Sequence, residues 1–255
     1  MSATQRWILV VVFAAAMAWF ESAAVTYLRT LVDRVEPYQA NPLPIAPRLG
    51  EAELIREMAT LIMLVTVGWL AGNTRRTRFG YVMIAFGVWD ILYYVFLKII
   101  VDWPHSILDW DVLFLLPLPW WGPVIAPVLV AGLMIIGGTL VTQFSHPDYP
   151  IWPGRGTWIL GLIGAALALF VFMSDAIRST GGGIEAIRTA LPTWFNWPLF
   201  IIALALMATS IIDMVKQIWQ RHKSQEGITL VPGSMHFGAQ SLLLLLLYKI
   251  ISRDT

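Results

Sequence analysis

The sequence has no cysteine, few charged residues and only four histidines, and each shortage excludes a class of protein. Without cysteine, the chain cannot form disulfides, hold an iron–sulfur cluster, attach haem covalently or use a thiol nucleophile. Charged residues make up 13% of the 255 residues, whereas hydrophobic residues make up 58%. This composition leaves too little polar surface for a soluble globule, so it predicts an integral membrane protein.

The balance of charge excludes nucleic acid as a partner. The formal net charge is only +1, and the lysines and arginines occur in short groups rather than in one basic stripe. A protein that binds nucleic acid through its phosphates needs such a stripe. The partners that this chemistry predicts are membrane lipids and other membrane protein subunits.

The histidines exclude most metal and cofactor sites. They fall in predicted loops or in the C-terminal tail, at His105, His146, His222 and His236. No predicted span therefore supplies an imidazole for haem, copper or zinc, and the Glu-x-x-His spacing of di-metal bundles is absent. No nucleophile elbow or phosphate-binding loop is present either. We expect no metal and no cofactor, and no catalytic residue can be assigned.

Six apolar runs are long enough to cross a hydrocarbon core, which takes about 20 residues of helix. The predicted fold is thus all-α, a polytopic transmembrane helix bundle that occupies residues 1–223. The first run is too long for a signal-peptide core, so we expect it to be retained. The six predicted spans are 6–29, 53–72, 79–101, 121–143, 157–177 and 197–219.

The tail, residues 224–255, contains a seventh apolar run at 237–251. This run is shorter than a standard span, and the basic residues Lys249 and Arg253 flank its apolar core. A short spanning helix and a helix lying in the membrane interface are both consistent with that pattern.

Basic residues next to the span ends predict the orientation of the bundle. With six spans, two basic groups fall on the side of the N-terminus, and the positive-inside rule makes that side cytoplasmic. The opposite side also has arginines, but acidic residues are interleaved with them. The two groups are Arg75, Arg76 and Arg78, and Lys216, Arg221 and Lys223.

An unexpected carboxylate lies inside the third predicted span, in the stretch GVWDILYYVFLK. Asp90 is near the membrane midplane, and Tyr93, Tyr94 and Lys98 follow it at helical spacing, which makes a polar stripe. Glu21 in the first span and Glu57 in the second are predicted at a similar depth. The nearby counter-charges and donors are Arg56, Lys98, Tyr27, Tyr93 and Tyr94.

A charge near the bilayer centre costs at least about 2.5 kcal/mol, so Asp90 should face protein or water rather than lipid. Two interpretations have about equal weight. The acids either form a hydrogen-bonded knot that ties the first three spans together, or they line a path or pocket for a proton, a cation or a polar headgroup.

The segment after the third span is rich in tryptophan and proline. Four prolines within eleven residues, from Pro117 to Pro127, prevent a continuous helix. We expect a re-entrant or interfacial hairpin packed against the third span. A rigid aromatic cap is the favoured interpretation, and a lid or docking platform for a quinone-like or lipid ligand is the alternative. Its candidate residues are Trp103, His105, Trp110, Asp111, Trp120 and Trp121.

Three motifs together resemble a group of uncharacterised bacterial polytopic integral membrane proteins of similar length. They are ESAAVTYLR, GVWDILYYVFLK and WPHSILDWDVLFLLPLPWWGP, and they cover the first span to the start of the fourth. The resemblance implies a bacterial inner-membrane protein with a polar cluster in its outer half, and it implies no activity.

Two hypotheses for the function follow. The first is a non-catalytic structural or accessory subunit of a larger membrane complex, for example one concerned with electron transfer. The second is a small transporter or intramembrane enzyme whose polar cavity is lined by Glu21, Glu57 and Asp90. The first is narrowly preferred, because the sequence contains no catalytic constellation and no transporter repeat.

Overall fold

A computed structural model describes residues 1–32, 37–38, 47–146, 148–183, 191–192 and 194–226. Within these ranges, six helices are long and apolar enough to cross a membrane. The prediction of a polytopic helical bundle with six spans is confirmed. The seventh apolar run at 237–251, and nearly all of the tail that begins at 224, lie outside the described residues. The six helices are α1 (Ala3–Leu31), α2 (Pro47–Ala71), α3 (Arg75–Val101), α4 (Ile125–Phe144), α5 (Arg155–Arg178) and α7 (Trp197–Glu226).

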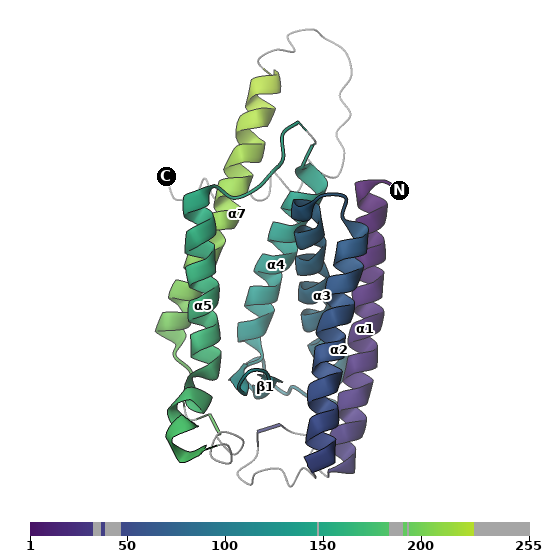
Figure 1. Ribbon diagram of the computed structural model, residues 1–255, viewed down its shortest axis with the longest axis vertical. Coiled ribbons are helices and arrows are strands. Elements are labelled where there is room, and N and C mark those ends of the chain that lie inside the picture. Colours follow the sequence, from purple (N-terminus) through teal and green to yellow (C-terminus); the bar gives the residue numbers. More distant parts are fainter. Residues whose placement is uncertain (33–36, 39–46, 147, 184–190, 193, 227–255) are drawn as a thin grey trace.

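Helix α3 is the centre of the bundle. It packs against α1, α2 and α4, while α4 connects this group to α7, and α5 packs along α7 (Figure 1). The 3₁₀ turn η1 (Ser179–Gly182) extends α5. The helices alternate in direction, so the end of α1, the end of α3 and the start of α4 lie together at what we call the hairpin end. The start of α1 and the turn between α2 and α3 lie at the opposite end, which we call the loop end.

Local capping interactions fix where the first and third helices begin. Ser2 accepts a hydrogen bond from the backbone N–H of Gln5, and the Gln5 side chain accepts one from the Ser2 N–H. Thr74 and Thr77 make the same reciprocal arrangement at the start of α3. These capping boxes satisfy N–H groups that the first turn of a helix leaves without partners.

Glycines let α3 and α4 approach each other closely. A Cβ atom added to Gly138 would lie 2.4 Å from the carbonyl oxygen of Gly80, and one added to Gly87 would lie 2.6 Å from that of Ala131. Both obstacles are backbone atoms, which a rotamer change cannot move. Small residues at such crossings allow the tight packing that holds membrane helices together.

Replacing Gly138 with alanine is expected to lower the free energy of unfolding by about 1–3 kcal/mol, because the added methyl group must push α3 and α4 apart. Gly132 on the same helix is the matched control, since a Cβ atom there would meet nothing within 4 Å. Its alanine variant should be neutral or slightly more stable. Unfolding of both purified variants in mixed detergent micelles tests this, and equal stability of the two would contradict the close crossing.

A two-stranded antiparallel sheet, β1 (Trp110–Phe114) and β2 (Trp120–Pro123), connects α3 to α4. These strands are an addition to the predicted all-helical fold. The ring of Phe114 lies 6.1 Å from that of Phe86 and 6.2 Å from that of Trp89. Trp89 precedes the last residue of α3 by 12 residues, which is about 18 Å of helix. The hairpin therefore extends from the hairpin end deep into the bundle.

The other face of the hairpin packs against α5. The rings of Trp120 and Phe172 are stacked with centroids 6.5 Å apart, and a Cβ atom on Gly122 would lie 2.9 Å from Phe172. The hairpin thus bridges the group formed by α1, α2 and α3 and the pair formed by α5 and α7. Packing between protein elements is what a non-helical backbone at membrane depth requires.

Candidate functional site

Polar side chains from α1, α2, α3 and β1 gather between the helices and the hairpin. Seven of them are buried: Glu21, Ser22, Glu57, Thr60, Asp90, Tyr94 and Asp111. We define the polar cluster as these seven residues together with Arg29, Arg56 and Tyr93.

Arg56 on α2 connects two carboxylates. Its Nη1 binds Glu21 on α1, and its Nη2 lies 2.8 Å from Oε2 of Glu53. Thr60 donates a hydrogen bond of 3.0 Å to the second oxygen of Glu21. Glu53, Arg56 and Thr60 are three to four residues apart, so they share one face of α2. This ion-pair group joins α1 to α2 within the membrane-spanning segments.

Arg29 and Asp111 form the second ion pair. Nη2 of Arg29 lies 3.1 Å from Oδ1 of Asp111, and the guanidinium lies 4.7 Å from the ring centroid of Trp103. Asp111 is fully buried, with 0% of its surface exposed. Burial raises the pKa of Asp111, and the positive charge of Arg29 opposes that rise. The pair fixes β1 to the end of α1.

Two further hydrogen bonds join the cluster to backbone groups. The carboxylate of Glu57 accepts a 3.1 Å hydrogen bond from the N–H of Leu115, the residue that directly follows β1. The hydroxyl of Ser22 donates a 3.0 Å hydrogen bond to the carbonyl oxygen of Tyr93. A hairpin in a membrane must satisfy its free N–H groups inside the protein, and Glu57 does so for Leu115.

Asp90 differs from the other acids because it has no hydrogen-bond donor among the residues that the structure describes. It is buried and interacts electrostatically with Asp111, while Tyr93 interacts with Arg29, Arg56, Asp90 and Asp111. Oδ2 of Asp111 is also buried without a hydrogen-bond partner, although the Tyr94 hydroxyl lies near this carboxylate. Carboxylate oxygens at the centre of the cluster could therefore accept further hydrogen bonds.

Two residues predicted for the cluster lie outside it. Tyr27 is 69% exposed on the surface of α1. Lys98 lies at the end of α3, where its Nζ is 2.7 Å from Asp102 and both side chains are largely exposed. The ammonium group lowers the pKa of Asp102. Lys98 therefore does not provide the counter-charge for Asp90, Glu21 or Glu57.

Arg29 is the last residue of the predicted first span, but sequence reasoning named only Arg56 and Lys98 as counter-charges and so missed Arg29 as a cation of the cluster. A signal was present, since Arg29 follows Ser22 by seven residues and Val25 by four, and both of these residues are buried on α1. Residues at this spacing lie on one face of a helix. Its partner Asp111 was predicted only as part of the aromatic hairpin.

The aromatic residues of the hairpin segment occupy different environments. Trp103 is buried with its ring centroid 6.3 Å from that of Tyr94. Trp110 packs against Phe195 at 6.0 Å, and Trp120 packs against Phe114 at 5.1 Å. The buried indole N–H groups of Trp120, Trp121 and Trp89 have no acceptor among the described residues. His105 lies on the exposed loop before β1, where its backbone N–H donates to Asp109.

Apolar side chains separate the polar cluster from the loop end. Within the described residues, every buried position of α1 from Val10 to Ala18 is apolar, and the next buried polar side chain on α3 is Tyr81. The hydroxyl of Tyr81 donates to the carbonyl oxygen of Ala3, at the loop end itself. The packed residues between are Val10, Ala14, Met17, Ala18, Leu64, Ile84, Ala85 and Val88. The cluster thus occupies only the half of the bundle near the hairpin.

In the part of the chain that the structure describes, no group of three or more His, Asp or Glu side chains is arranged to hold a metal ion. Comparison with known proteins finds no matching family model, no matching curated protein and no matching solved structure. The resemblance to a group of bacterial membrane proteins therefore stays a prediction. What the structure and sequence establish is a multi-pass membrane protein with six candidate spans.

Proposed function

We propose that this chain is a non-catalytic accessory subunit of a larger membrane complex, in which the polar cluster holds the hairpin inside the bundle. The observation that carries this proposal is that the charged groups bind groups on different elements. Arg56 joins α2 to α1, Arg29 joins α1 to β1, and Glu57 joins α2 to the hairpin backbone. Such bonds fix the positions of the elements relative to one another, and they occupy the charged groups of these side chains.

The apolar core between the cluster and the loop end supports this proposal over transport. A path for a proton or cation needs polar groups or water across the whole membrane thickness. Along α1 and α3, buried apolar side chains such as Ala14, Met17 and Ile84 lie between the cluster and Tyr81. The predicted orientation, with the N-terminus in the cytoplasm, would place the cluster in the outer half of a bacterial inner membrane.

A partner surface at the hairpin end is part of the proposal. Ile107 and Leu108 are 61% and 58% exposed on the loop between α3 and β1. The loop is held rigidly, because Asp109 accepts hydrogen bonds of 2.7 and 3.0 Å from the N–H groups of His105 and Ser106. Exposed apolar side chains on a loop outside the spans are available for contact with a partner protein.

Replacing Ile107 and Leu108 together with serine is expected to abolish stoichiometric co-purification of partner subunits in mild detergent. The fold should be unaffected, since both side chains are exposed. The matched control exchanges Ile107 for leucine and Leu108 for isoleucine, which keeps the apolar surface and should keep the partners. If the natural chain itself purifies as a single species without partners, the accessory role is wrong.

The second candidate, a small transporter or intramembrane enzyme, is favoured by one observation. Among the described residues, Asp90 is buried with no hydrogen-bond donor to its carboxylate, and Oδ2 of Asp111 is buried without a partner. Such groups inside membranes commonly bind protons or substrates. Proton uptake by vesicles that contain only this chain would favour this candidate over the accessory role.

A further inference from the structure

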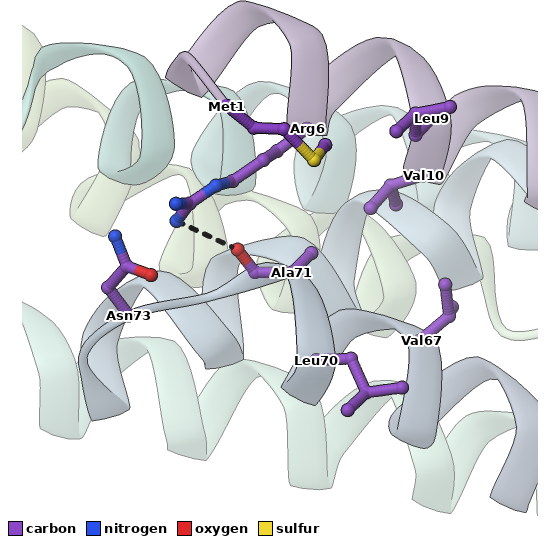
Figure 2. A pocket seen from close by; sticks show the side chains of 8 residues that line it. All are labelled: Met1, Arg6, Leu9, Val10, Val67, Leu70, Ala71 and Asn73. Carbon is purple, nitrogen blue, oxygen red and sulfur yellow. Dashed lines mark hydrogen bonds between the residues drawn. The ribbon is translucent and has the colours of Figure 1, made fainter.

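A groove of about 340 Å³ lies between the first turns of α1 and the last turns of α2, at the loop end and away from the polar cluster (Figure 2). This volume is within the range of small-molecule sites. The residues that line it are Met1, Arg6, Leu9, Val10, Val67, Leu70, Ala71 and Asn73.

The two ends of the groove differ in chemistry. Arg6 and Asn73 lie at one end, and the apolar side chains of Leu9, Val10 and Val67 line the other (Figure 2). Arg6 donates one hydrogen bond of 3.3 Å to the carbonyl oxygen of Ala71. A guanidinium has five N–H donors, so four remain for a ligand. Within the described part of the chain, Arg6 has no carboxylate partner.

The depth of these residues matches the layers of a lipid. Arg6 is in the first turn of α1 and Ala71 is the last residue of α2, so the polar end lies where the spans leave the membrane. Leu9 and Val67 lie about one helical turn deeper, at the level where acyl chains begin. Leu70 is 79% exposed and extends the apolar wall toward the surrounding lipid.

The charge around the groove selects an anion. The first turns of α1 and α3 contain no acidic residue, and Arg75, Arg76 and Arg78 follow Asn73 closely in the chain. The N-terminal ends of both helices add a partial positive charge at the same end of the bundle. A phosphate group near Arg6 would therefore be attracted by these positive charges, which outweigh the partial negative charge at the C-terminal end of α2.

We propose that this groove is a binding site for an anionic phospholipid, whose phosphate binds Arg6 and Asn73 and one of whose acyl chains lies along Leu9, Val10 and Val67. The site is independent of the proposed accessory role, since it lies at the other end of the bundle. Its bound lipid would hold α1 and α2 together where the polar cluster does not reach.

The test uses the full chain in nanodiscs of phosphatidylcholine that contain a small fraction of phosphatidylglycerol, with lipids bound after extraction counted by native mass spectrometry. The natural chain should retain one phosphatidylglycerol in preference to phosphatidylcholine. Arg6→Gln should weaken this retention about five- to tenfold, as expected for the loss of one cation at a lipid phosphate. Arg155→Gln is the matched control, because Arg155 is exposed at the start of α5 and outside the groove.

A second variant keeps the proposal testable if the Arg6→Gln protein does not fold stably. Val67→Phe fills the apolar part of the groove, leaves Arg6 in place and should also weaken phosphatidylglycerol retention. Two results would overturn the proposal: retention by Arg6→Gln equal to that of the natural chain, or retention of phosphatidylcholine equal to that of phosphatidylglycerol.

Discussion

Replacing Arg29 with alanine is expected to lower the free energy of unfolding by about 3–5 kcal/mol, because the variant leaves the carboxylate of Asp111 buried without its cation. Asp111 is fully buried and Arg29 is its ion-pair partner at 3.1 Å. The loss should also release β1 from α1. Unfolding of the purified variant in mixed detergent micelles measures the effect.

The stability lost in Arg29→Ala should depend on pH in a defined direction. Burial raises the pKa of Asp111, and Arg29→Ala removes the charge that opposes this rise. A carboxyl group whose pKa is raised in the folded state costs stability once the unfolded state ionises while the folded state still holds its proton. The deficit should therefore be small well below the ordinary aspartate pKa of about 3.9, grow as the pH rises from there toward the folded-state pKa, and level off above it.

Two further variants test whether burial, rather than charge alone, makes the Arg29–Asp111 pair important for stability. Arg29→Ala combined with Asp111→Asn should recover part of the lost stability, because no buried charge is left unpaired. Lys98→Ala should have no measurable effect, since the Lys98–Asp102 pair is exposed. If Lys98→Ala destabilises the protein as much as Arg29→Ala, burial is not what gives the Arg29–Asp111 pair its importance.

Replacing Arg56 with alanine should cost about 3 kcal/mol of unfolding free energy, at the lower end of the range for broken buried pairs. The side chain of Glu21 is only 5% exposed and would lose its cation, while that of Arg56 is 22% exposed, so water offsets part of the loss. Thr60 would remain the donor to Glu21. The same detergent unfolding measurement applies.

Lysine at position 56 is the informative control for this second prediction. It keeps the charge but lacks the planar fork with which Arg56 binds Glu21 and Glu53 together. We expect a stability between those of the natural chain and Arg56→Ala. A lysine variant as unstable as the alanine variant would show that geometry, and not charge, carries the interaction.

The positions of the spans could be predicted because they depend on local sequence alone. Runs of apolar residues set the six helices, and the predicted third span 79–101 lies within α3, which begins at Arg75. Capping residues such as Thr74 explain why the helix starts before the apolar run does. The buried position of Asp90 also followed from a local argument, the cost of exposing a charge to lipid.

The partners of the charged residues could not be predicted in the same way. Arg29 and Asp111 are 82 residues apart in the chain, and nothing local indicates that the hairpin folds back into the bundle far enough to join them. Lys98 has the helical spacing that predicts a place beside Asp90, but the nearby exposed Asp102 binds it instead. Contacts of this kind depend on the tertiary path of the hairpin.

The central claim is that the hairpin lies inside the bundle and that the polar cluster keeps it there. Because the chain has no cysteine, single-cysteine labelling with a membrane-impermeant maleimide tests this directly. Leu115→Cys, directly after β1, should stay unlabelled in the natural background and become reactive when Arg29→Ala is added, whereas Leu108→Cys should react in both. Rapid labelling of Leu115→Cys in the natural background, at the rate of Leu108→Cys, would contradict the account.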